Sequence, residues 1–215
     1  MSRNITEALG HWLDAGATQI GQVEIRRTAE GYHLLHFEDA LREDLERSLR
    51  PEDARHLAVY DDEGRFRPLR TAPNLRHGWL LQLTGLPEVR LALDHFYPGM
   101  LGVLVSYEKQ QLPVLPLRAL LERQTGMYTV TKKITDEEAQ TMIGGFCKSQ
   151  GGCLKTILWP ISPEAPVTSL PREKFDPSVN QTGTPAHAIP MLCHEGCNLL
   201  VAQARTVVKG RADAK

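Results

Sequence analysis

The chain has 215 residues, of which 41% are hydrophobic and 24% are charged, a composition typical of a globular protein with one large or two small domains. Its net charge of −1 gives no basic field, so we expect no nucleic acid as a partner. No apolar run reaches the roughly 20 residues that span a bilayer, and the first residues lack an apolar leader. We therefore expect a cytoplasmic protein with no membrane partner.

Residues 1–110 predict a small α+β domain. Asn4 is a candidate helix N-cap with Glu7 as its capping-box partner. The segments 19–27 and 32–37 follow as two strands around a short turn, which is the pattern of a hairpin.

Three leucines spaced by four residues predict a second helix: Leu41, Leu45 and Leu49. Further segments predict two hairpin strands, a third strand, a helix and a final strand: 57–60, 65–69, 79–83, 87–96 and 101–106. This order mixes hairpins with helices, so we expect an α+β fold with a mainly antiparallel sheet.

Residues 108–116 hold two prolines and no periodicity, and they predict a linker to a second domain over residues 111–210. The expected elements there are a helix, a strand, a helix with the capping box of Thr135 and Glu138, and a closing helix after Pro190: 117–124, 127–133, 136–143 and 192–208. Seven prolines between residues 160 and 190 leave a long stretch without a pattern.

The four cysteines of the chain form two close pairs in its last third. Cys147 and Cys153 are separated by five residues and flanked by Gly-Gly pairs, and Cys193 and Cys197 are separated by three. Disulfides are rare in the cytoplasm, so close pairs of this kind favour a metal site or redox chemistry. We expect the two pairs to converge and to offer four thiolates to one centre, around which the second domain is built.

The second pair is expected in the first turns of the closing helix. There Cys193 and Cys197 would share one face, with Cβ atoms about 5–6 Å apart, close to the positive end of the helix dipole. The spacing of the four cysteines matches neither the tight knuckles of common zinc modules nor the ferredoxin runs. An iron–sulfur cluster, zinc and four buried thiols without metal therefore all stay open, with the cluster favoured.

Several segments resemble a known family: the run Gln124 to Thr131, Gly145-Phe146-Cys147, Cys153-Leu154-Lys155, Trp159, Cys193-His194-Glu195-Gly196-Cys197-Asn198, and in the first half Trp79, Leu93 and Tyr97-Pro98-Gly99. Together they are similar to the C-terminal part of multidomain CbiX-like chelatase family proteins. The resemblance covers nearly the whole chain and implies a stabilising or interaction domain at 1–110 and a four-cysteine [4Fe-4S] domain at 111–210.

By this resemblance the cluster ligands are Cys147, Cys153, Cys193 and Cys197. The chelatase-type domains of the family have no counterpart in this sequence. We therefore expect an electron-transfer or accessory protein rather than a stand-alone enzyme. It would work with a separate chelatase or redox partner in tetrapyrrole metal chelation; a zinc-stabilised interaction module is the alternative.

Two residues beside the cysteines are candidates for supporting roles. His194 follows Cys193 directly and is interpreted as a polar neighbour of the centre rather than a ligand. Trp159 is interpreted as a core side chain that keeps water from the centre. The arginines around residues 65–76 are interpreted as a solvent-exposed hairpin face.

Overall fold

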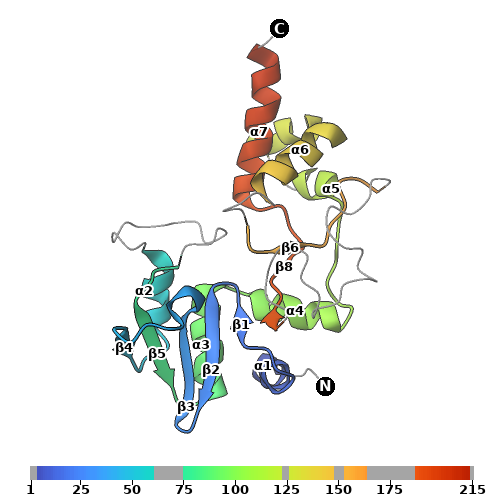
Figure 1. The fold of residues 1–215 in the computed structure, drawn as a ribbon. Coiled ribbons are helices and arrows are strands. Elements are labelled where there is room, and N and C mark those ends of the chain that lie inside the picture. The colour runs from blue at the N-terminus through green and yellow to red at the C-terminus, as the bar shows by residue number, and fades with distance from the viewer. Residues whose placement is uncertain (1–3, 61–74, 123–125, 148–152, 164–186, 214–215) are drawn as a thin grey trace. The chain divides into compact units, whose positions relative to one another are not determined.

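The computed structural model describes residues 4–60, 75–122, 126–147, 153–163 and 187–213 (Figure 1). The chain divides into two compact units, which confirms the expected α+β fold with two domains. The first unit contains Met1–Gln110 with Pro177–Met191, and the second contains Gln111–Asp176 with Leu192–Lys215. The sequence had suggested two contiguous ranges, whereas the structure returns a late segment of the chain to the first unit.

The first unit is built on a six-stranded sheet with the strand order β4-β5-β3-β2-β1-β7 (Figure 1). Its strands are β1 (Gln19–Ile20), β2 (Val23–Thr28), β3 (Gly31–His36), β4 (Glu46–Ser48), β5 (Trp79–Leu83) and β7 (Ala188–Ile189). The inner pairs β1–β2, β2–β3 and β3–β5 are antiparallel, and the two edge strands β4 and β7 are added in parallel. The expected mainly antiparallel sheet is therefore confirmed.

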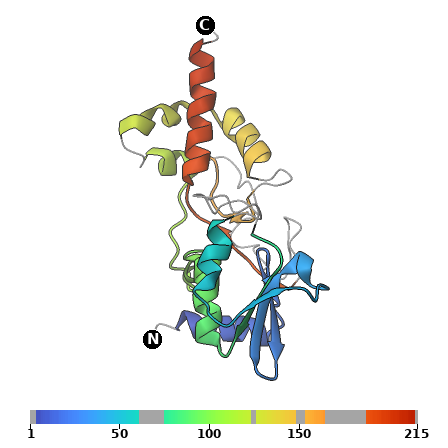
Figure 2. The same ribbon diagram turned by 90° about the vertical axis from the view of Figure 1, so that its left-hand side faces the viewer.

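Helices cover this sheet and close the core of the first unit. They are α1 (Ile5–Asp14), α2 (Asp53–Val59), α3 (Leu86–Phe96) and α4 (Met100–Glu108), with a short 3-10 turn, η1 (Phe37–Asp39). Helix α3 packs against β3 and is flanked by α1 and α2; Figure 2 shows α2 and α3 to one side of the strands. Alternation along β5 turns Trp79, Leu81 and Leu83 into the core, where each is almost fully buried.

The first helix begins where the sequence predicts. The Asn4 side chain accepts the Thr6 backbone N–H at 3.2 Å, and Glu7 accepts the Asn4 backbone N–H at 3.2 Å. The Asn4 side chain also accepts the Glu7 backbone N–H, and together with the bond from Asn4 to the Glu7 carboxylate this forms the expected capping box.

Gly21 breaks the single strand expected at 19–27 into β1 and β2. Its φ of +55° suits glycine, and an added Cβ would lie 2.5 Å from the Tyr97 Oη. That oxygen accepts the Gln22 backbone N–H at 2.8 Å, so the break lets the loop contact the end of α3.

The helix predicted from Leu41, Leu45 and Leu49 is wrong. Leu41 is 97% exposed and Leu49 is 71% exposed, and the segment between them contributes the edge strand β4. A leucine spacing of four residues gives a helix its stability only if the leucines find a surface to pack on. Here the leucines at the two ends of the pattern lie in solvent instead.

Two further strand predictions are also wrong. Residues 57–59 fall in α2, which Tyr60 caps, and residues 101–106 fall in α4. Short apolar runs do not distinguish a buried strand from a buried helix, because every residue of the run is hydrophobic in either case. The hairpin partner expected at 65–69 lies outside the described residues.

The second unit is mainly helical. Its elements are α5 (Leu117–Glu122), η2 (Gly126–Lys133), α6 (Asp136–Phe146), β6 (Thr156–Ile157), β8 (Leu192–Cys193) and α7 (Asn198–Asp213). The strand expected at 127–133 is wrong, since this segment is the 3-10 helix η2. The helix after Thr135 is confirmed with its capping box, and most of the proline-rich segment lies outside the described residues.

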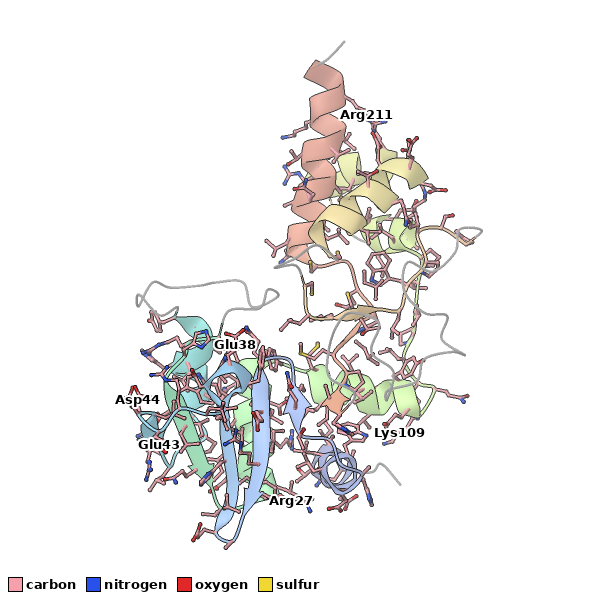
Figure 3. All side chains as sticks on the ribbon, in the orientation of Figure 1. Arg27, Glu38, Glu43, Asp44, Lys109 and Arg211 are labelled. Carbon is pink, nitrogen blue, oxygen red and sulfur yellow. The ribbon has the colours of Figure 1, made fainter. Side chains whose placement is uncertain are left out.

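An apolar core joins α5, α6 and α7 around Trp159. Its largest fully buried members are Leu117, Leu121, Ile143 and Trp159, and Leu200 with Val201 reach it from α7. At the far end of α7, Arg211 donates to the Lys133 carbonyl at 2.9 Å and pairs with Glu138 at 3.1 Å (Figure 3). No helix in the described part of the chain combines the length and hydropathy that crossing a membrane requires.

Candidate metal centre

The first cysteine pair lies between α6 and β6. Cys147 caps the C-terminus of α6, where its backbone N–H donates to the Ile143 carbonyl at 2.9 Å. Cys153 lies just ahead of β6, and both cysteines are partly buried. The capping box at the start of α6 and the core contacts of Ile143 therefore fix the place of Cys147.

The second pair does not share one helix face, so that expectation is wrong. Cys193 lies in strand β8, and Cys197 occupies the N-cap position of α7. The Cys197 Sγ accepts the Leu200 backbone N–H at 3.4 Å, and the Cys197 carbonyl accepts the Val201 N–H at 3.0 Å. A sulfur in this position lies at the positive end of the helix dipole.

Strands β6 and β8 hold the two halves of the site together. They pair in parallel with Ile157 opposite Cys193, and the Leu158 N–H continues the ladder to the Cys193 carbonyl at 3.0 Å. Cys147, Cys193 and Cys197 all pack against the same apolar core that contains Trp159. Two chain segments that are far apart in sequence thus bring one cysteine of the first pair and both of the second to one core.

Burial and nearby positive charge have opposite effects on the pKa of two of these thiols. Burial raises the pKa of the Cys153 thiol, and the neighbouring Lys155 backbone and ammonium act against it. Burial likewise raises the pKa of the Cys193 thiol, against the Trp159 side chain and the Lys155 ammonium. Negative charge on Cys193 and Cys197 also raises the pKa of Cys153, so these three sulfurs are close enough to interact electrostatically.

Burial disfavours the charged form of the Cys153 and Cys193 thiols when no metal is bound. A bound cation reverses this preference, since coordination deprotonates a thiol outright. The Cys193 Sγ donates to the Glu195 carbonyl at 3.2 Å, a bond that thiol deprotonation would remove. None of the four cysteines forms a disulfide, so each sulfur can serve as a metal ligand.

The polar groups around the sulfurs fit an anionic, sulfur-ligated centre. The Leu200 N–H already points at Cys197, and the buried Trp159 indole N–H and the Lys155 ammonium act on Cys193. Hydrogen bonds to sulfur and nearby positive charge are among the features that stabilise iron–sulfur clusters and set their potentials.

The two histidines near the second cysteine pair, His187 and His194, belong to different units. The His194 Nε2 lies 3.3 Å from the Glu195 carboxylate, consistent with a polar neighbour of the site. The carbonyl of His187 accepts the Thr18 backbone N–H at 2.9 Å, so His187 belongs to the first unit.

A set of ligating side chains that the sequence analysis missed lies in the first unit. His36, Asp39 and His77 each offer one atom, and these atoms lie within 4.8 Å of one another. However, the His36 Nδ1 accepts the Glu38 N–H at 3.2 Å, whereas a metal-bound histidine donates from its second nitrogen. His36 would therefore have to break this bond to bind a cation through Nε2.

Asp39 in this set already has polar partners. Its Oδ2 accepts the Gly78 N–H at 2.6 Å, and its Oδ1 lies 3.2 Å from the Arg42 guanidinium. Burial raises the pKa of Asp39, but the bonds from Gly78 and Arg42 outweigh it and hold the pKa below its usual range. The cluster is thus a hydrogen-bonded junction that fixes η1 against the start of β5.

Replacing Asp39 with Asn should destabilise the first unit by about 1–3 kcal/mol at pH 7, because a buried charged acceptor is lost. A carboxyl with a lowered folded pKa stabilises fully above its unfolded pKa of about 3.9, and this stabilisation disappears as the pH falls through the folded value. The difference between wild type and Asp39→Asn should therefore shrink below about pH 4. Urea unfolding followed by Trp79 fluorescence, repeated across this range, measures it.

Asp44→Asn is the matched control for this prediction. Asp44 also pairs with Arg42, at 2.9 Å, but its side chain is 76% exposed (Figure 3). An exposed pair contributes about 0–1 kcal/mol, so this variant should unfold close to the wild type. Equal losses of stability in both variants would show that the hydrogen bond from Gly78 to Asp39 adds nothing beyond the ion pair with Arg42.

Comparison with known proteins agrees with this arrangement over nearly the whole chain. The model of a 4Fe-4S iron–sulfur cluster binding domain matches residues 109–206, and the model of the DR2241 stabilising domain matches residues 5–108. The expected resemblance and the predicted [4Fe-4S] cofactor are thereby confirmed. No curated protein matches the sequence.

A solved structure matches both units. It is DR2241 from Deinococcus radiodurans, described as a multi-domain protein with structural similarity to chelatases and two additional novel domains. The match covers 96% of this chain at 26% identity with a TM-score of 0.72, and it spans 41% of the solved chain. Over nearly its whole length this chain is therefore similar to a DR2241 stabilising domain followed by a 4Fe-4S iron–sulfur cluster binding domain.

Proposed function

We propose that this iron–sulfur protein transfers electrons through one [4Fe-4S] cluster held by Cys147, Cys153, Cys193 and Cys197. The proposal is supported above all by the polar surroundings of the sulfurs. The Leu200 N–H meets the sulfur of Cys197, and the Lys155 ammonium lowers the pKa of Cys193 against the effect of burial.

These groups favour a centre that accepts an electron. One-electron reduction adds a negative charge, which spreads over the cysteine sulfurs of a cluster. N–H donors and an ammonium beside those sulfurs stabilise the added charge. Zinc has no redox chemistry, so a zinc ion in this place could not accept an electron.

The natural setting we propose is tetrapyrrole metal chelation, with a chelatase or a redox protein as the partner. This part rests on the DR2241 match, since that protein is described as similar to chelatases. The first unit, which matches a stabilising domain, would then stabilise the protein or bind the partner.

The test is the content of iron, zinc and acid-labile sulfide per chain in protein purified without oxygen, with visible spectra before and after dithionite and after reoxidation. About four iron and four sulfide, with reversible bleaching, would support electron transfer. A cluster that no reductant can cycle would refute electron transfer. One zinc with no sulfide would refute the cluster itself and would leave an interaction module.

The partner is tested separately, with the loaded protein and a chelatase-type protein from the same source. We expect complex formation in sedimentation velocity and a faster metal insertion when reductant is present. Unchanged insertion with and without the iron–sulfur protein would remove the link to chelation but would not touch electron transfer.

A further inference from the structure

The indole N–H of Trp159 is buried without an ordinary hydrogen bond. The side chain is 0% exposed, and within the described part of the chain its Nε1 has no partner that meets hydrogen-bond geometry. An unsatisfied donor in a core costs roughly 1–3 kcal/mol, so a native protein that keeps one has a use for it. Leucine or phenylalanine would fill such a core without the cost.

The register of β6 and β8 places this indole next to a cysteine. Ile157 lies opposite Cys193 in the parallel pair, and partners in a ladder send their side chains to the same side. Trp159 follows Ile157 by two residues, just after the end of β6, and the Leu158 N–H between them donates to the Cys193 carbonyl at 3.0 Å. Trp159 and Cys193 also share one core cluster.

The effect of the indole on Cys193 agrees with this placement. Burial raises the pKa of the Cys193 thiol, and the Trp159 side chain is the first of the groups that lower it.

We infer that Trp159 is a positioning residue whose indole N–H donates to the sulfur of Cys193 in the loaded protein and raises the reduction potential of the centre. The inference rests on the proposed function, because it needs a cluster that can be reduced. Hydrogen bonds to the ligand sulfurs are an established means of setting cluster potential, and a donor favours the more negative, reduced form. The unpaired N–H thus gains its acceptor when the cysteine sulfur becomes charged.

Trp159→Phe tests this inference, because it keeps an aromatic side chain in the core and removes the N–H. Potentials are measured by anaerobic spectroelectrochemical titration of the full-length loaded protein. We expect wild-type iron and sulfide content and an equilibrium constant for reduction lowered about three- to tenfold, where tenfold equals about 59 mV for a one-electron couple. Resonance Raman spectra should show altered Fe–S stretching bands, which loss of packing far from the sulfur would not cause.

The matched control is Trp12→Phe. The Trp12 indole donates to Glu108 at 2.8 Å within the first unit, so this variant removes an indole hydrogen bond whose acceptor is a carboxylate of that unit. Its potential should equal that of the wild type. An unchanged potential in Trp159→Phe with full cluster content would overturn the inference.

A third variant covers the case in which Trp159→Phe fails to retain the cluster. Incorporation of 3-benzothienylalanine at position 159 keeps the bicyclic shape and replaces the N–H by sulfur. A lowered potential there supports the inference, and a wild-type potential refutes it. If the wild type itself holds no reducible cluster, the proposed function fails rather than this assignment.

Discussion

Cys193→Ala should lose most of its iron and labile sulfide and should unfold the second unit under conditions in which the wild type is folded. Cys193 lies in β8, so its side chain is attached to the strand that pairs with β6, and its thiol is buried beside the apolar core. When a site is completed only in the folded state, the free energy of metal binding contributes directly to folding. Losing a ligand removes both the centre and that stabilisation.

The three tryptophans of the chain make this result measurable unit by unit. Trp159 belongs to the second unit, and Trp12 and Trp79 belong to the first. We expect Cys193→Ala to lose the signal of the buried Trp159 while the first unit retains its unfolding midpoint in urea. His194→Ala is the control, because His194 is the next residue and pairs with Glu195 at 3.3 Å without offering a sulfur. Full cluster content in Cys193→Ala would contradict the proposed ligand set.

Gly31→Ala should be the most damaging single change in the first unit, with a loss of about 3 kcal/mol or more. Gly31 opens β3 at the hairpin and has a φ of +142°. A Cβ there would lie 2.2 Å from the Leu83 carbonyl oxygen and 3.0 Å from the Thr84 Cα. Both contacts are with backbone, so relief requires β3 and β5 to separate at the centre of the sheet.

Gly16→Ala is the matched control, because Gly16 also has a positive φ, +96°, but an added Cβ would meet nothing within 4 Å. It should cost about 1 kcal/mol from backbone strain alone. The measurement is the urea midpoint of the first unit, followed through Trp79 in β5. A loss in Gly31→Ala no larger than in Gly16→Ala would mean that the sheet accommodates the methyl group.

Helices whose first residues form a capping box were predicted correctly from the sequence. The capping boxes at Asn4 and Thr135 were found because the bonds that begin a helix are made within four residues. The four cysteines were found because close pairs of thiols indicate a metal or redox site whatever the fold around them. The spacing of Leu41, Leu45 and Leu49 failed, because it carries no information on whether a packing surface exists.

The details of the site depended on contacts between distant segments. Strands β6 and β8 have two residues each, too short for any alternation to be seen, and their pairing joins residues 156–157 to residues 192–193. The interpretation of Trp159 as a buried core residue agrees with the structure, but its proximity to Cys193 follows from that pairing alone. His36, Asp39 and His77 were missed for the same reason, since a turn and a strand far along the chain bring them together.

The edge strand β7 has a consequence for how the protein is made. Ala188–Ile189 closes the sheet of the first unit beside β1, so that sheet stays one strand short while the ribosome synthesises most of the second unit. An open edge is a site of association with other chains, and a fragment ending at residue 110 would expose the same edge permanently. Cys193 and Cys197 emerge just after the closing strand. The nascent chain therefore completes its sheet and its set of thiols at the same late stage of synthesis.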